Sequence, residues 1–122
     1  MASGTLKKLN VGPVNTVMFP KTYSLAANQS TEIGRITIPK GIYLIQLYGQ
    51  FDADELTANR IEANIAGVGT QVAKGQQYPK FNVTTIYEAR SESNTVLATI
   101  FTTSARSGSF AHLTCSYIKL GE

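Results

Sequence analysis

Apolar residues alternate with polar ones in short runs along most of this chain, and turn residues separate the runs. The clearest case is residues 36–51, ITIPKGIYLIQLYGQF, where Pro39-Lys40-Gly41 divides two apolar runs. Proline cannot donate to a strand ladder and glycine tolerates positive φ, so we expect two strands joined by a tight turn. No long stretch has the period of an amphipathic helix. The pattern therefore predicts an all-β sandwich or barrel of about eight to ten antiparallel strands.

The runs and breaks predict one domain over residues 14–122, preceded by an arm or linker over residues 1–13 that ends in Gly12-Pro13. At 122 residues the chain can bury one core. We expect Gly67-Val68-Gly69 to form a hairpin turn, and residues 52–58 to form a loop with one helical turn. The expected strands are 14–19, 23–25, 31–38, 42–51, 59–66, 70–74, 81–89, 95–103 and 110–120.

The long strand 42–51 is apolar on both faces, because Tyr43, Ile45 and Leu47 alternate with Leu44 and Tyr48. A strand in a sheet with one solvated face should have one polar side. A chain of this length has few means of covering both sides by itself. We therefore expect one side to meet the core and the other to meet another subunit.

Charge and composition exclude several classes of protein. The 11 Lys and Arg residues exceed the 8 Asp and Glu residues by a formal +3, but they are scattered, whereas a nucleic-acid surface would concentrate them on one face. Residues 96–105, VLATIFTTSA, are too short and too polar to insert into a membrane. Residues 1–13 contain no apolar segment of a secretory signal. We expect a protein made in a cytoplasm, as virion proteins also are.

The sequence contains few residues that could act together in catalysis, and we expect neither an enzyme nor a bound cofactor. His112 is the single histidine and Cys115 the single cysteine, and their spacing puts them on opposite faces of a strand. Asp52, Asp54 and Glu55 form an acidic cluster that lacks the pattern of a calcium loop. Whether a metal binds there stays open, with a solvated loop as the expected state.

Four segments follow one another in an order that matches a known family: Pro39-Lys40-Gly41-Ile42-Tyr43, the hairpin Ile61–Ala73, Ser93-Asn94-Thr95-Val96, and the closing strand Leu113–Leu120. This order resembles the jelly-roll domain shared by tumour necrosis factor and the complement globular head, especially its versions at bacteriophage tail-fibre tips and on other phage surface proteins. The likeness spans about residues 14–120. Complement-like members of the family usually have aspartate where this chain has Asn94.

The resemblance implies a homotrimer on a virion surface, with the first strand, the last strand and strand 42–51 around a threefold axis. The family often places tyrosines at that axis. Tyr48, Tyr117 and Tyr87 are accordingly the expected trimer-interface residues. Aromatic side chains are enriched at such interfaces because they supply a large contact area and keep a polar end.

Three functions follow from this resemblance. The first is a phage receptor-binding domain that holds a bacterial surface carbohydrate during host adsorption, with avidity from three copies. The second is a capsid-decoration or fibre-capping protein without sugar binding, attached to other virion proteins through arm 1–13. The third is a cytokine-like or complement-like ligand of a protein receptor. For sugar binding, we expect the polar and aromatic turn residues Tyr78, Gln76, Gln77, Arg90, Asn94 and Arg106.

Overall fold

The computed structural model describes residues 11–54, 56–73 and 75–122, and these residues form antiparallel strands and no helix. The all-β prediction is therefore confirmed. Several strands begin earlier than expected, with β3 starting at Gln29 rather than 31 and β9 at Arg106 rather than 110. Within the described residues there are nine strands: β1 (Val14–Met18), β2 (Thr22–Leu25), β3 (Gln29–Ile38), β4 (Gly41–Phe51), β5 (Ile61–Ile65), β6 (Val68–Gln71), β7 (Lys80–Ala89), β8 (Asn94–Thr102) and β9 (Arg106–Gly121).

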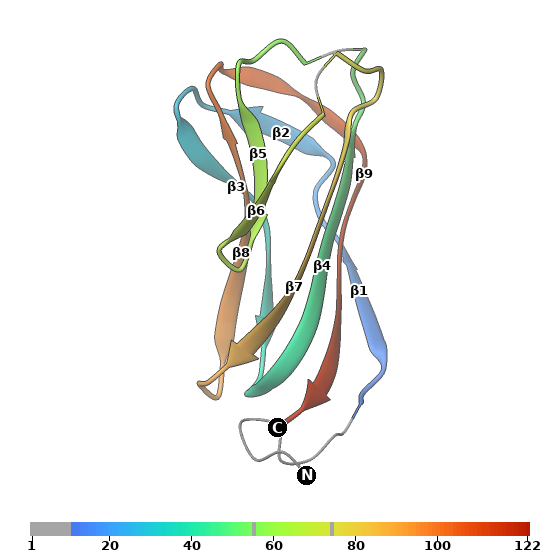
Figure 1. The fold of residues 1–122 in the computed structure, drawn as a ribbon, viewed down its shortest axis with the longest axis vertical. Helices are drawn as coiled ribbons and strands as arrows, with labels where there is room; N and C mark the ends of the chain where they lie inside the picture. The colour runs from blue at the N-terminus through green and yellow to red at the C-terminus, as the bar shows by residue number, and fades with distance from the viewer. Residues whose placement is uncertain (1–10, 55, 74) are drawn as a thin grey trace.

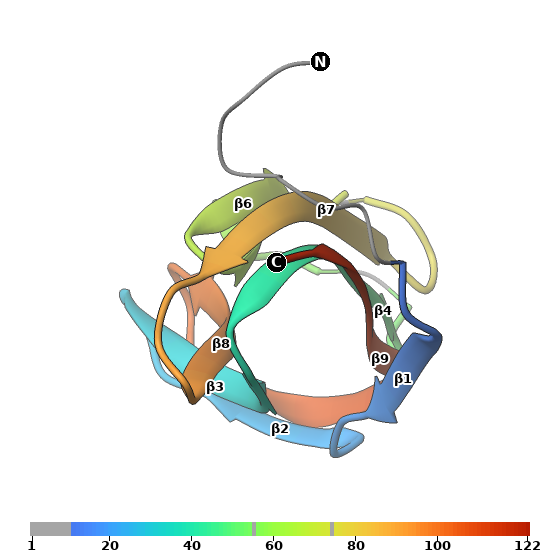
Figure 2. The same cartoon turned by 90° about the horizontal axis from the view of Figure 1, so that it is seen from below.

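The strands form two sheets that curve around one core (Figures 1 and 2). One sheet has the order β1-β9-β4-β7, and β2 pairs with the first part of β9; we call it the long sheet. The other has the order β3-β8-β5-β6, which we call the short sheet. Strands β6 and β7 lie side by side at one border, and β2 lies against β3 at the other. This arrangement is a sandwich compatible with a jelly roll.

Alternation along the strands separates the core from the outside as predicted. On β4, Tyr43, Ile45 and Leu47 are buried, whereas the intervening Leu44 and Gln46 are exposed. The same alternation holds on β5, β7 and β8. The inward residues from both sheets make one hydrophobic core.

Four aromatic rings cluster in this core. Phe51 lies 4.9 Å from Phe110 and 5.5 Å from Tyr23, measured between ring centroids, and 5.9 Å from Phe81. The Phe81 ring also covers Gly49, its cross-strand partner, where an added Cβ would lie 2.1 Å from the ring. Only glycine leaves room there for the ring to pack against the backbone.

Two local predictions are wrong. The hairpin between β5 and β6 turns at Ala66-Gly67, both with positive φ, and Val68 already pairs with Ile65. Two consecutive positive-φ residues give the two-residue turn whose twist suits the strands it joins. The return strand predicted over 70–74 therefore begins two positions earlier, at Val68, and ends at Gln71. The helical turn predicted within 52–58 is absent from the described residues of that segment, which form bends and irregular backbone.

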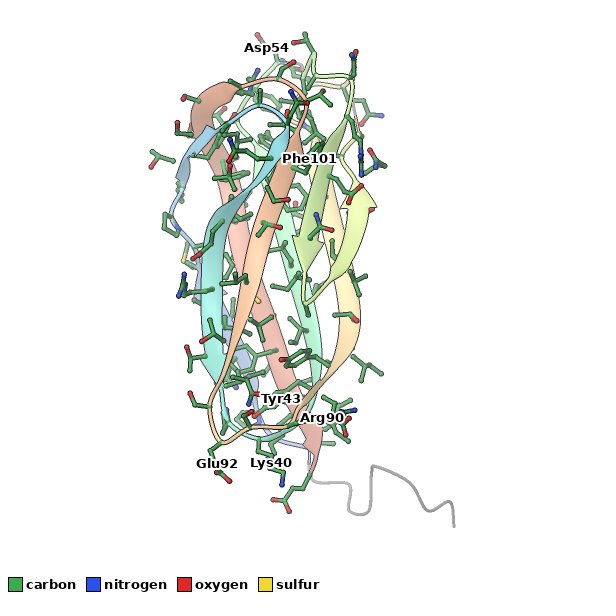
Figure 3. All side chains as sticks on the ribbon, turned by 90° about the vertical axis from the view of Figure 1, so that its left-hand side faces the viewer. Lys40, Tyr43, Asp54, Arg90, Glu92 and Phe101 are labelled. Carbon is green, nitrogen blue, oxygen red and sulfur yellow. The ribbon has the colours of Figure 1, made fainter. Side chains whose placement is uncertain are left out.

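The sandwich has two distinct ends. The lower end carries the turns with Lys40, Arg90 and Glu92, and the upper end carries Asp54 and the loop 75–79 (Figure 3). The C-terminus lies at the lower end (Figure 1). The Gly12 amide donates a 2.8 Å hydrogen bond to the Lys119 carbonyl, so the described start of the chain lies there too. The first ten residues of the predicted arm lie outside the described residues.

Candidate functional site

The outer face of the long sheet carries a continuous row of four aliphatic side chains, one each from β1, β9, β4 and β7. Val14 pairs with Ile118, Ile118 with Leu44, and Leu44 with Ile86. Residues directly opposite in antiparallel strands project on the same side and touch. Val14 and Ile86 are each 66% exposed and Leu44 is 37% exposed. We call Val14, Ile118, Leu44 and Ile86 the apolar row.

Uncharged polar side chains adjoin the apolar row toward the upper end. Thr16 and Ser116 share a 3.0 Å hydroxyl hydrogen bond, and the Gln46 amide donates to Asn82 Oδ1 at 3.2 Å. The next positions hold Met18, which is 69% exposed, and the half-buried Tyr48. The centre of this outer face therefore combines aliphatic, aromatic and neutral polar groups.

The outer face of the short sheet is different. The Arg35 and Glu32 side chains make an ion pair at 2.6 Å, and the hydrogen bond from Arg35 lowers the pKa of the Glu32 carboxyl. The Arg60 guanidinium pairs with Glu62 at 3.0 Å and lies 4.9 Å from the Phe101 ring centroid. This ionic pattern is typical of a solvated sheet face. By contrast, the apolar row is the kind of patch that marks an interaction surface.

The three tyrosines predicted for the trimer interface do not share one face. Tyr48 projects outward on β4, the strand that also carries Leu44 of the apolar row. Tyr117 and Tyr87 project inward and pack against the core, with the Tyr117 ring 6.1 Å from that of the buried Tyr43. Of the three, Tyr48 is the one on the apolar surface. The others lie near the lower end of the sandwich, where Tyr43 is seen in Figure 3.

Four of the six predicted sugar-binding residues lie at the upper end. Gln76, Gln77 and Tyr78 are exposed and belong to the loop 75–79, and Arg106 begins β9. The Tyr78 amide donates to the Ala53 carbonyl at 2.8 Å, while the residue as a whole is 42% exposed. This bond holds the loop against segment 52–54 and leaves the tyrosine ring available.

Arg90 and Asn94 lie at the opposite, lower end, so they do not form one site with Tyr78 within a single chain (Figure 3). Arg90 pairs with Glu88 at 2.9 Å. The Asn94 amide donates to the Ile38 and Ser91 carbonyls at 3.1 and 2.7 Å, and its oxygen accepts from the Ser91 amide at 3.2 Å. The Asn94 side chain therefore closes the turn before β8.

The remaining candidates for chemistry do not come together. His112 is exposed, whereas Cys115 is buried on the inner face, which confirms that they lie on opposite faces of the strand. Asp52 and Asp54 are exposed, and Glu55 lies outside the described residues. Among the residues described, no group of three His, Cys, Asp or Glu side chains is placed to hold a metal ion. No helix in the described ranges is long and apolar enough to cross a membrane.

Burial raises the pKa of the Cys115 thiol to about 11. We expect the native protein to resist a thiol-specific disulfide reagent at pH 8, and to react once it is unfolded in denaturant. The folded state keeps a thiol proton that the unfolded chain releases above about pH 9. The free energy of unfolding should therefore decrease as the pH rises from 9 to 11. A Cys115→Ala variant should lose this part of the pH dependence. Fast labelling of native protein would contradict the burial.

One small pocket at the upper end includes a predicted residue. Arg106 lines it together with Thr57, Ser104 and the buried Ile61, in a volume of about 40 Å³. Sites that enclose a whole small molecule are usually about 300–1,000 Å³. The pocket suits a single chemical group rather than a complete ligand.

Sequence comparisons do not assign the chain to a family. No protein-family profile matches it, and a search of curated proteins finds no match. The resemblance to the jelly-roll domains of phage surface proteins therefore depends on strand order and turn residues.

Proposed function

We propose that this protein is a bacteriophage virion domain of the jelly-roll type, a homotrimer that binds bacterial surface carbohydrate during host adsorption. The observation that carries the proposal is the apolar row on the outer face of the long sheet. Three of its members are exposed in the single chain. A second and third copy are the simplest cover for it, because every copy brings the same apolar row and the same neutral polar border.

The two ends of the sandwich support the host-binding part of the proposal. The described start of the chain and the C-terminus share the lower end, where the arm would attach to other virion proteins. The upper end then points away from the particle and presents Tyr78, Gln77 and Arg106 to the host. An exposed tyrosine ring stacks on a sugar ring, and amide and guanidinium groups bond its hydroxyls.

A second candidate is a capsid-decoration or fibre-capping protein that binds no sugar. The small size of the upper-end pocket and the structural role of Asn94 favour it. Deleting residues 1–13 should then abolish attachment to the particle and leave the trimer intact.

An array of bacterial surface glycans separates the two candidates. We expect the labelled protein to bind a subset of the array, the Tyr78→Ala variant to lose that binding, and the lower-end Arg90→Gln variant to keep it. The trimeric mass of each variant is checked in parallel. A correctly assembled protein that binds no glycan and does not compete with phage adsorption would overturn sugar binding in favour of the second candidate.

A further inference from the structure

The pocket at the upper end is built around an arginine that the fold holds in place. Arg106 Nε donates a 2.9 Å hydrogen bond to the Tyr23 hydroxyl. Tyr23 is itself buried, packs 4.9 Å from the Phe110 ring, and lies over Gly108, where an added Cβ would come 2.8 Å from the hydroxyl. One edge of the guanidinium is therefore fixed by a rigid aromatic group.

The other edge of the Arg106 guanidinium has no partner among the described residues. No described carboxylate lies within 4.0 Å of it, unlike Arg35, Arg60 and Arg90, which all make ion pairs. A guanidinium has five N–H donors, and within the described part of the chain a partner is found for the one on Nε alone. The free donors form the planar fork that matches a carboxylate or phosphate with two parallel hydrogen bonds.

The other pocket residues suit an acidic group carried on a sugar. Thr57 and Ser104 supply hydroxyls at the exposed rim, and the buried Ala58 and Ile61 supply an apolar wall. A volume of about 40 Å³ accommodates one small anionic group while the rest of the ligand stays outside. The exposed ring of Tyr78 belongs to the same end of the sandwich.

From this geometry we infer that Arg106 forms an anion subsite, and that the ligand is an acidic surface glycan whose carboxylate enters this pocket. The inference rests on the proposed function and narrows its substrate class. It also gives Arg106 a role of its own among the predicted sugar-binding residues. Arg106 would bind the charged group of the ligand, whereas Tyr78 would stack on the sugar ring.

The test uses the full chain and three probes, with binding followed by amide NMR shifts. The probes are an oligomer of galacturonic acid, the same oligomer with its carboxyls methyl-esterified, and inorganic phosphate alone. We expect the acidic oligomer to shift the amides of residues 104–106 and to bind about tenfold or more tightly than its ester. Raising the salt concentration should weaken the binding. Phosphate alone should bind more weakly at the same amides.

Two variants and a matched control complete the experiment. Arg106→Gln should weaken binding of the acidic oligomer about tenfold or more. Ser104→Glu, which adds a repelling charge at the rim and leaves the Tyr23 bond intact, should do the same if Arg106→Gln folds poorly. Arg90→Gln removes an arginine at the far end and should change nothing.

Equal binding of the acid and its ester, or unchanged binding by both variants, would overturn the subsite. Phosphate binding as tight as that of the acidic oligomer would overturn the glycan assignment and leave a general anion site. If neutral glycans bind and acidic ones do not, the anion subsite fails while the proposed function stands. An intact trimer that binds no glycan of either kind defeats the proposed function instead.

Discussion

Replacing Ile86 by lysine is expected to convert the proposed trimer into single folded chains. Ile86 is 66% exposed in one chain and lies at the β7 end of the apolar row. In an isolated subunit the lysine would be solvated, so the fold should survive. Between subunits an unpaired ammonium would have to leave water, which costs several kcal/mol. Size-exclusion chromatography with light scattering measures the change directly.

Leu97→Lys provides the matched control for Ile86→Lys. Leu97 is an exposed aliphatic residue at 42%, but it projects from the outer face of the short sheet, opposite Arg35. Its replacement should leave the mass unchanged. If both variants stay trimeric, or if Leu97→Lys alone dissociates, the apolar row is not the surface that joins the copies.

Phe51→Ala should strongly destabilise the folded chain. Phe51 has no exposed surface and contacts Tyr23, Phe81 and Phe110 at the centre of the aromatic cluster. Truncating a buried phenylalanine leaves a cavity and typically lowers the free energy of unfolding by about 3–5 kcal/mol. Denaturant unfolding at a fixed chain concentration gives the value, because assembly makes stability depend on concentration.

Phe101→Ala is the control for the aromatic cluster. Phe101 projects from the outer face of the short sheet, half-buried beneath Arg60. Its truncation removes a cation–π contact, worth about 0.5–1 kcal/mol at such a site, and the burial of part of one ring, so the loss should be smaller than for Phe51→Ala. A loss for Phe51→Ala no greater than that for Phe101→Ala would contradict the assignment of the core.

The sequence alone was sufficient for most of the strands and for their inner faces. Burial of every second residue needs only local alternation, and the closely spaced Pro39 and Gly41 mark a turn. For this reason Ile45 and Leu47 could be placed in the core, and Leu44 on the other face, without any knowledge of the sheet order. The hairpin turn was missed because Ala66 takes positive φ, which alanine rarely does.

The outer apolar row could not be predicted in full from the sequence, because it forms only when the register of strand pairing aligns its four residues. Val14 and Ile86 lie far apart in the sequence, and each stands beside polar residues on the outer face of its strand. Only the pairing of β1, β9, β4 and β7 lines them up. The sequence does show an aliphatic residue at an outward position of each of these strands. Strict alternation of polar and apolar residues leaves such residues unexplained.

The predicted sugar-binding residues were chosen because they stand in turns, and a turn prediction does not say at which end of a sandwich the turn lies. The structure separates Arg90 and Asn94 from Tyr78 and Arg106 by the length of the molecule. It also distinguishes arginines that already have carboxylate partners from Arg106, a distinction that needs tertiary contacts.

Two further copies of the chain are proposed to cover the outer face of the long sheet, and the proposed function depends on that assembly. Light scattering on the purified protein over a range of micromolar concentrations tests it most directly. We expect a mass three times that of the 13.2 kDa chain. A compact, well-behaved species with the mass of one chain throughout that range would contradict the trimer.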